Sequence, residues 1–124
     1  IFYADGAIYN GEMKDNMING LGKLITKENV VFEGSFVKGN LNGKGKTIYP
    51  DGYELEGNFV NDTLNGIGSI KYSDGSLYKG EILNFTKNGR GILKKLNGDT
   101  FEGSFKNDNI HGEGIWKYAK GSWR

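Results

Sequence analysis

The chain has 124 residues, of which 21 are glycine, one is proline and none is cysteine, and 16 lysines and arginines nearly balance 15 aspartates and glutamates. The length suits one domain, the lack of cysteine excludes disulfides and thiolate chemistry, and the near-neutral charge provides no bulk attraction to nucleic acid or anionic membranes. No run approaches the roughly 18 apolar residues of a membrane-spanning helix, and a chain that starts at Ile1 is expected to be a piece of a longer protein.

Glycine recurs along the chain at a spacing of 23 residues. Twenty of the 21 glycines fall into four series with this spacing; Gly39 is the exception, and Asn29 replaces the one glycine that is missing. Self-similarity at a fixed period indicates a repeat protein. We therefore divide the chain into a partial repeat at 1–8 and five repeats at 9–31, 32–54, 55–77, 78–100 and 101–124.

Each repeat opens with the pattern apolar–x–Gly–x–apolar, as in Tyr78, Gly80 and Ile82. A period of two is typical of a strand, here with the glycine and both apolar residues on one face. Because glycine removes a side chain, a neighbouring ring can lie flat over the bare backbone. Short strands are predicted at 9–13, 32–36, 55–59, 78–82 and 101–105.

A polar connection, such as residues 106–111, then leads to a second strand that reads Gly-x-Gly-x-x-x-aromatic, as from Gly43 to Tyr49. Dipeptides such as Asp51-Gly52 join one repeat to the next and favour tight hairpin turns, so we expect these connections to be the shorter ones. Each strand then pairs antiparallel with the next. The predicted fold is all-β: an elongated, single-layer antiparallel meander of about ten strands, about 45–50 Å long.

Charges alternate between the two kinds of strand. The first strands carry mostly glutamate and the second strands mostly lysine, which favours cross-strand pairs of about 0.2–1 kcal/mol each. A sharper interpretation takes a group of basic residues as a contact site for anionic lipid headgroups, although the intervening glutamates weaken it. That candidate group is Lys71, Arg90, Lys94 and Lys95.

An uncovered apolar face of a few hundred Å² marks an interaction surface, and a helix is a natural ligand for it. The aromatic face is therefore the best candidate site for a protein partner. Trp116 and Trp123 occur only in the last repeat and are expected to cap the sheet end or to dock onto a following domain. The predicted partner-binding residues are Phe36, Phe59, Phe105, Tyr49, Tyr72, Tyr118 and Trp116.

Catalysis is not expected. One histidine, His111, no cysteine and polar residues that recur in every repeat leave no unique set of nucleophile, base and orienting group. We predict a protein that is not an enzyme and that carries no cofactor and no metal.

The repeat resembles a known family, the MORN (membrane occupation and recognition nexus) repeat. Its core reads roughly Tyr-Glu-Gly-Glu-Trp/Phe-x-Asn-Gly-x-x-His-Gly-x-Gly, followed by an Asp-Gly turn. The family histidine is kept only at His111, and the fourth repeat has an unusual loop at 83–87. The resemblance is carried by Tyr78-Lys79-Gly80-Glu81, residues 101–108, His111-Gly112-Glu113-Gly114 and Asp74-Gly75.

The resemblance implies an elongated, twisted single sheet with an aromatic-lined groove. It also implies tethering, homo-association, binding of a partner peptide, or attachment to a membrane or the cytoskeleton. We expect a non-catalytic cytoplasmic scaffold that binds a protein partner or another copy of itself. Two alternatives stay open: an adaptor that contacts a membrane or a phosphoinositide, and a regulatory segment of a larger enzyme such as a lipid kinase or methyltransferase. Fold alone does not choose among these.

Overall fold

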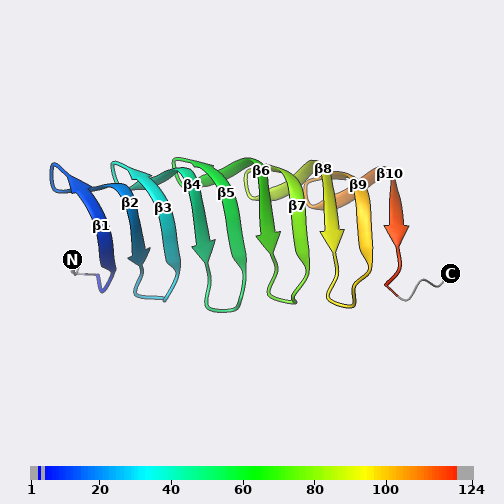
Figure 1. Cartoon of the computed structure of the whole chain (residues 1–124), viewed down its shortest axis with the longest axis horizontal. Coiled ribbons are helices and arrows are strands. Elements are labelled where there is room, and N and C mark those ends of the chain that lie inside the picture. The colour runs from blue at the N-terminus through cyan, green and yellow to red at the C-terminus, as the bar shows by residue number, and fades with distance from the viewer. Residues whose placement is uncertain (1–2, 4, 120–124) are drawn as a thin grey trace.

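The computed structural model describes residue 3 and residues 5–119. All regular structure in this part of the chain is β-strand, and the strands stand side by side in chain order (Figure 1). This confirms the predicted all-β, single-layer antiparallel meander. The ten strands are β1 (Ile8–Lys14), β2 (Met17–Ile25), β3 (Val31–Val37), β4 (Asn40–Ile48), β5 (Glu54–Val60), β6 (Thr63–Lys71), β7 (Leu77–Leu83), β8 (Thr86–Lys94), β9 (Thr100–Lys106) and β10 (Asn109–Lys117).

A line of glycines crosses the whole sheet. Gly57 of β5 faces Gly45 of β4 on one side and Gly68 of β6 on the other, and the same pairing continues from Gly11 in β1 to Gly114 in β10. The register of the strands thus follows the 23-residue spacing of the sequence. Beside this line, the register shifts within each of the hairpins β1–β2, β3–β4, β5–β6, β7–β8 and β9–β10, which is the signature of a bulge.

The rings lie over this bare backbone, as the glycine spacing predicts. A Cβ added to Gly91 would collide with the ring of Tyr78, and one added to Gly103 would stand 2.8 Å from the ring tip of Phe101. Tyr78 is 0% exposed although the sheet has a single layer. The absent glycine side chains therefore make the space in which the aromatic residues are buried.

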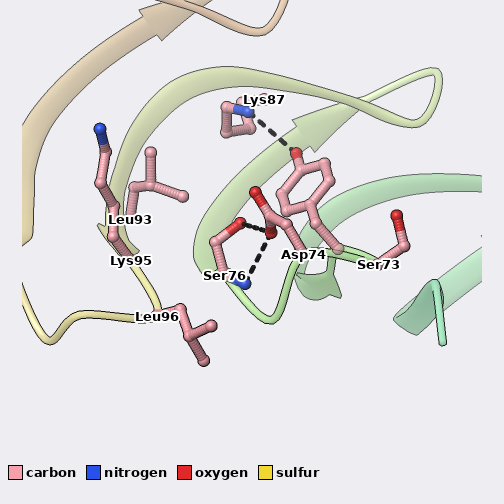
Figure 2. Close-up of a pocket in the computed structure, with 8 residues that line it drawn as sticks. Ser73, Asp74, Ser76, Lys87, Leu93, Lys95 and Leu96 are labelled. Carbon is pink, nitrogen blue, oxygen red and sulfur yellow. Dashed lines mark hydrogen bonds between the residues drawn. The ribbon is translucent and has the colours of Figure 1, made fainter.

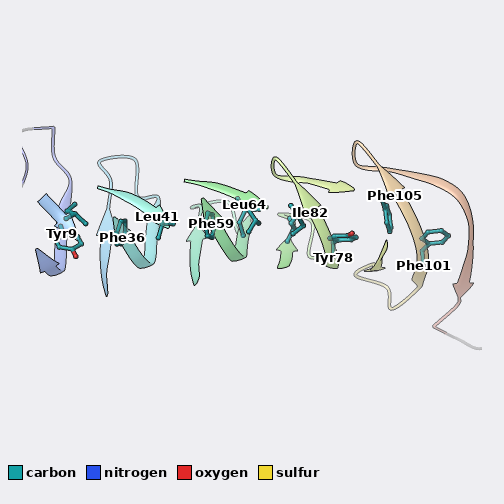
Figure 3. Packing of buried hydrophobic residues seen from close by; sticks show 12 residues of the cluster. Tyr9, Phe36, Leu41, Phe59, Leu64, Tyr78, Ile82, Phe101 and Phe105 are labelled. Carbon is teal, nitrogen blue, oxygen red and sulfur yellow. The ribbon is translucent and has the colours of Figure 1, made fainter. Parts of the chain in front are cut away.

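The buried residues form one row along the long axis of the sheet (Figure 3). Because those that share a strand are an even number of positions apart, such as Leu55 and Phe59 in β5, they lie on one face of the sheet. We call this the inner face and the opposite one the outer face. The cluster contains Tyr9, Ile18, Phe36, Leu41, Leu55, Phe59, Leu64, Ile70, Tyr78, Ile82, Phe101 and Phe105.

The predicted lengths of the two kinds of connection are wrong: the connections within a repeat are the shorter ones. Within a repeat, two residues such as Asn61 and Asp62 join the strands, and both have positive φ (48° and 68°), as in the tightest hairpin turns. Between repeats, the Asp-Gly dipeptide lies in a longer loop, where Gly52 N–H donates to the Tyr49 carbonyl (3.0 Å) and Tyr49 N–H to the Tyr53 carbonyl (2.8 Å). Asn and Asp tolerate the left-handed backbone well enough to make the shorter turn without glycine.

Part of the predicted charge alternation is present on the outer face. Glu33 stands opposite Lys23 and Lys46, and the Glu54 carboxylate lies 3.3 Å from Lys46 Nζ and 3.8 Å from Lys71 Nζ. Toward the C-terminal end the pattern fails, because Glu102 faces Ile92 and Ile115 instead of basic residues.

Candidate functional site

Three of the residues predicted to bind a partner lie inside the cluster. Phe36, Phe59 and Phe105 are 1%, 2% and 3% exposed. Phe36 packs edge-on against Tyr9 at 5.9 Å between ring centroids, and Phe105 against Tyr78 at 5.1 Å. In this packing they support the inner face from within, and a partner could not touch their side chains without displacing their neighbours.

The tyrosines that end the second strands are more accessible, and two of them form a row with a third that the sequence analysis missed. Tyr49 contacts Tyr53 at 5.3 Å between ring centroids, and Tyr53 contacts Tyr72 at 5.9 Å. All three are half-buried. Tyr53 could have been found from the sequence, because it and Tyr49 flank the same turn, with three residues between them.

At the C-terminal end, Trp116 and Tyr118 stack at 6.3 Å with an interplanar angle of 10°. They are 37% and 42% exposed, so both present ring surface to a partner. Trp116 also packs against Phe101 at 5.2 Å, which anchors the pair to the cluster. Trp123, the other tryptophan of the last repeat, lies outside the described residues. Tyr49, Tyr53, Tyr72, Trp116 and Tyr118 are called the aromatic row from here on.

The four basic residues considered for lipid contact do not share a face. Leu93 packs against the buried cluster, so its neighbour Lys94 points to the outer face. Lys71 is also on the outer face, where it pairs with Glu54 at 3.8 Å. Arg90 is the neighbour of Gly91, whose inner side the Tyr78 ring covers, and it therefore points outward. Lys95 is on the inner face, with its Nζ 5.3 Å from the centroid of the Trp116 ring.

A buried lysine interrupts the inner face between β6 and β9. Lys87 is 9% exposed and is the one charged side chain among the buried residues of the described ranges. Its Nζ donates to the Tyr72 hydroxyl at 2.9 Å, lies 4.6 Å from the centre of that ring, and is 3.9 Å from the Asp108 carboxylate. The sequence carried a signal for this residue: Leu64 and Ile110 stand 23 residues before and after it.

The electrostatics of this region follow from burial. Loss of solvent lowers the pKa of Lys87, and the nearby carboxylates of Asp108 and Asp74 oppose that shift only in part. Burial first, and Asp108 second, raise the pKa of Tyr72. The pKa of the Asp74 carboxyl is lowered because the Ser76 hydroxyl and amide both donate to it, at 2.6 and 2.8 Å.

Next to Lys87 the inner face is hollowed, over a volume of about 440 Å³. Figure 2 shows Ser76 and Asp74 on one side of this hollow and Leu93, Lys95 and Leu96 on the other. Tyr72, Ser73 and Lys87 complete its lining. Apolar walls with a few polar groups can bind the side chain of a partner or a small organic molecule.

The described ranges contain no cluster of three or more His, Cys, Asp or Glu side chains that could hold a metal ion. His111 lies in β10 with an exposed side chain. The hollow brings together apolar side chains, serines, a carboxylate and lysines, an arrangement that suits binding.

Comparison with known proteins identifies the repeat from which the sheet is built. The family model described as "MORN repeat" matches four segments, residues 9–27, 32–52, 56–77 and 101–123. The 23-residue segment 78–100, which contains Lys87 and Lys95, has no match. A search of curated protein sequences gives no match. In the described part of the chain, no helix has the length and apolar character needed to cross a membrane. The division into a partial repeat and five complete repeats remains a prediction.

Proposed function

Because the chain belongs to the MORN repeat family, a non-catalytic repeat type generally associated with protein and membrane interactions, we propose that it is a non-catalytic interaction scaffold. Its partner is a protein segment, either a peptide or helix or a second copy of the chain. The segment lies along the aromatic row of the inner face. The observation that carries this proposal is the partial exposure of that row next to the buried cluster.

The energetics favour such a contact. Tyrosine and tryptophan are the residues on which binding energy concentrates in protein interfaces, and complete burial of one large apolar side chain contributes about 1.5–3 kcal/mol. Trp116 and Tyr118 are 37% and 42% exposed, so a partner would gain by covering them. Two rows of the same face are already ordered in the free chain, since the phenylalanines are buried and the tyrosines contact one another, which limits the conformational entropy lost on binding.

Membrane attachment is the weaker alternative. MORN repeats are associated with contact to membranes and the cytoskeleton, but the four basic candidate residues divide between the two faces and Lys71 is already paired with Glu54. A surface for anionic lipid needs several uncompensated cations together. The proposed location is therefore cytoplasmic, with any contact to membrane or cytoskeleton made through a protein partner. If the chain is instead a regulatory segment of a larger enzyme, it would bind its partner through the same aromatic row.

The proposal is tested with a double variant of the aromatic row, Tyr49→Ser with Tyr118→Ser. Its matched control replaces two exposed apolar residues of the outer face, Leu21→Ser with Ile67→Ser, which are 67% and 69% exposed in the native chain. Sedimentation velocity measures self-association of each protein. Photo-crosslinking in an extract identifies a partner, and titration calorimetry with that purified partner measures its affinity.

The inner-face variant should lose self-association or bind the purified partner at least about tenfold more weakly, equivalent to about 1.4 kcal/mol, while the control stays within about twofold. Equal binding by both variants contradicts the proposal. Binding to vesicles of phosphatidylcholine with phosphatidylserine, but to no protein, would replace it with the membrane alternative.

A further inference from the structure

The hollow beside Lys87 has a counterpart one repeat earlier that is filled. Adding 23 to the numbers of Tyr49, Tyr53 and Tyr72 gives positions 72, 76 and 95, which are Tyr72, Ser76 and Lys95. In the earlier repeat the Tyr53 ring lies between its two neighbours, at 5.3 and 5.9 Å. In the later one a serine takes the place of the central ring.

The equivalence extends to the walls and to the backbone. The lining residues Asp74, Lys87 and Leu93 stand 23 residues after Asp51, Leu64 and Ile70. Ser76 N–H donates to Asp74 Oδ1 at 2.8 Å, just as Tyr53 N–H donates to Asp51 Oδ1 at 3.0 Å. Because the turn has the same hydrogen bond in both repeats, the hollow corresponds to the space that a tyrosine ring occupies one repeat earlier.

We propose that this hollow receives a tyrosine-type aromatic side chain from the protein partner. The inference rests on the proposed function and names the chemistry of one contact. The incoming ring would replace the missing one, packing against Tyr72 on one side and against the aliphatic stem of Lys95 on the other. Aromatic pairs add about 0.5–1.5 kcal/mol beyond the area that they bury, and lysine stems cover apolar surface while the ammonium group stays in contact with water or with a ring.

An anion is the competing occupant, and the contacts argue against it. The Lys87 ammonium already interacts with the Tyr72 hydroxyl at 2.9 Å and with Asp108 at 3.9 Å. Lys95 Nζ lies over the Trp116 ring. The Asp74 carboxylate, which lines the hollow, would repel a phosphate or a second carboxylate. The same carboxylate can accept a hydrogen bond from a phenol, which favours tyrosine over phenylalanine.

The test uses p-cresol as a probe for the tyrosine side chain and follows backbone amide shifts by NMR in the whole chain. Amides of Asp74, Ser76 and Leu96 should shift with millimolar p-cresol. 3-Methylbutanol, a leucine side-chain analogue, and inorganic phosphate serve as the aliphatic and anionic probes, and both should shift these amides at least about tenfold more weakly at equal concentration.

Two variants change the hollow in opposite directions. Ser76→Tyr should fill it from within and abolish the p-cresol shifts, and the equivalent Tyr53 shows that the turn accepts this side chain. Tyr53→Ser should open a second hollow, so that amides of Asp51 and residue 53 now respond to p-cresol. Thermal unfolding of each variant checks that the sheet is intact.

The inference is overturned if p-cresol leaves the native amides unshifted, if Ser76→Tyr binds it as well as the native chain does, or if 3-methylbutanol or phosphate binds equally well. These outcomes differ from failure of the scaffold proposal, because the probe experiment needs no partner. A partner that depends on Tyr49 and Tyr118 while p-cresol does not bind would refute this inference alone. Binding of p-cresol with no protein partner would refute the scaffold and, with it, the protein source of the ring, and would leave only the preference of the hollow for a phenol.

Discussion

Replacing Lys87 with leucine should stabilise the sheet, although the change removes a hydrogen bond and an ion pair. Leucine restores the apolar residue found at the equivalent position of the preceding repeat, where Leu64 is 0% exposed. It buries about as much apolar surface as the lysine stem does. The difference between the two side chains is therefore the ammonium group and its surroundings.

The sign of that difference follows from the pKa. Attraction of the ammonium to Tyr72 and Asp108 includes a charge-assisted hydrogen bond of about 1.5–3 kcal/mol and a ring contact of about 0.5–2 kcal/mol. The pKa of Lys87 is nevertheless lowered, because burial outweighs these attractions. Replacement of buried ion pairs by apolar residues is often neutral or stabilising by about 1–4 kcal/mol. Asp108 is half exposed and still accepts the residue 87 amide proton (2.7 Å), so we expect a gain near the low end, about 1 kcal/mol.

The assay is urea unfolding followed by tyrosine and tryptophan fluorescence, which gives the unfolding free energy. In a separate thermal scan, the melting temperature is expected to rise by about 4 °C. The matched control, Leu64→Lys, places an ammonium where the residue equivalent to Asp108 is Phe85, and should cost about 3–5 kcal/mol. If the unfolding free energy of Lys87→Leu is lower than that of the native chain by about 1 kcal/mol or more, the reasoning is refuted. The hydrogen bond and the ring contact would then outweigh the cost of burial.

The pH dependence gives a second check on the same variant. Because the folded-state pKa of Lys87 lies below the ordinary value of 10.5, the unfolded chain binds more protons in the window between the two values. The native protein therefore recovers stability as the pH rises through that window. The advantage of Lys87→Leu should be full at pH 7 and should shrink as the pH approaches 10.5. A constant advantage would contradict the burial of a charged lysine.

Three further predictions concern the rings and the outer face. Tyr78→Phe removes the hydroxyl that donates to the Glu81 carbonyl at 2.7 Å and should lower the unfolding free energy by about 1 kcal/mol at pH 7. Because burial raises the pKa of Tyr78 to about 12, the stability of the native protein should fall between pH 10 and pH 12. Urea unfolding should show a smaller fall for this variant. Gly91→Ala forces a methyl group into the Tyr78 ring and should lower the unfolding free energy by about 1–3 kcal/mol, more than Gly45→Ala, whose nearest neighbour is a leucine methyl at 3.0 Å; equal losses would contradict the ring packing. Glu54→Gln breaks two partly exposed ion pairs and should change stability by about 1 kcal/mol at most, an effect that 1 M salt should remove; a larger, salt-independent loss would show that Glu54 has a role beyond charge.

Several features of the fold and the site were predictable from residues alone. The 23-residue spacing of glycine sets the strand register, because a glycine in each strand must face a glycine in the next for the rings to lie over bare backbone, as Tyr78 does at Gly91. The period of two also assigns residues to faces. Even Lys87 could have been recognised as an anomaly, since its equivalents are Leu64 and Ile110.

Other features required the tertiary structure. The predicted turn lengths were wrong because both dipeptides favour turns. The sequence alone cannot say whether Asn61-Asp62 or Asp51-Gly52 adopts the left-handed backbone of the shorter turn. The period of two puts Phe59 on the inner face but does not say how deeply it lies; neighbouring repeats bury it to 2% exposure. Accessibility depends on side chains that are distant in sequence.

The sequence by itself determined a repeated, single-layer sheet with one aromatic face, because local periodicity and backbone geometry are encoded residue by residue. Only the tertiary structure decided which of those rings a partner can reach. It also revealed that Ser76 and Lys95 leave a hollow beside Lys87, because a cavity arises from what neighbouring repeats do not fill.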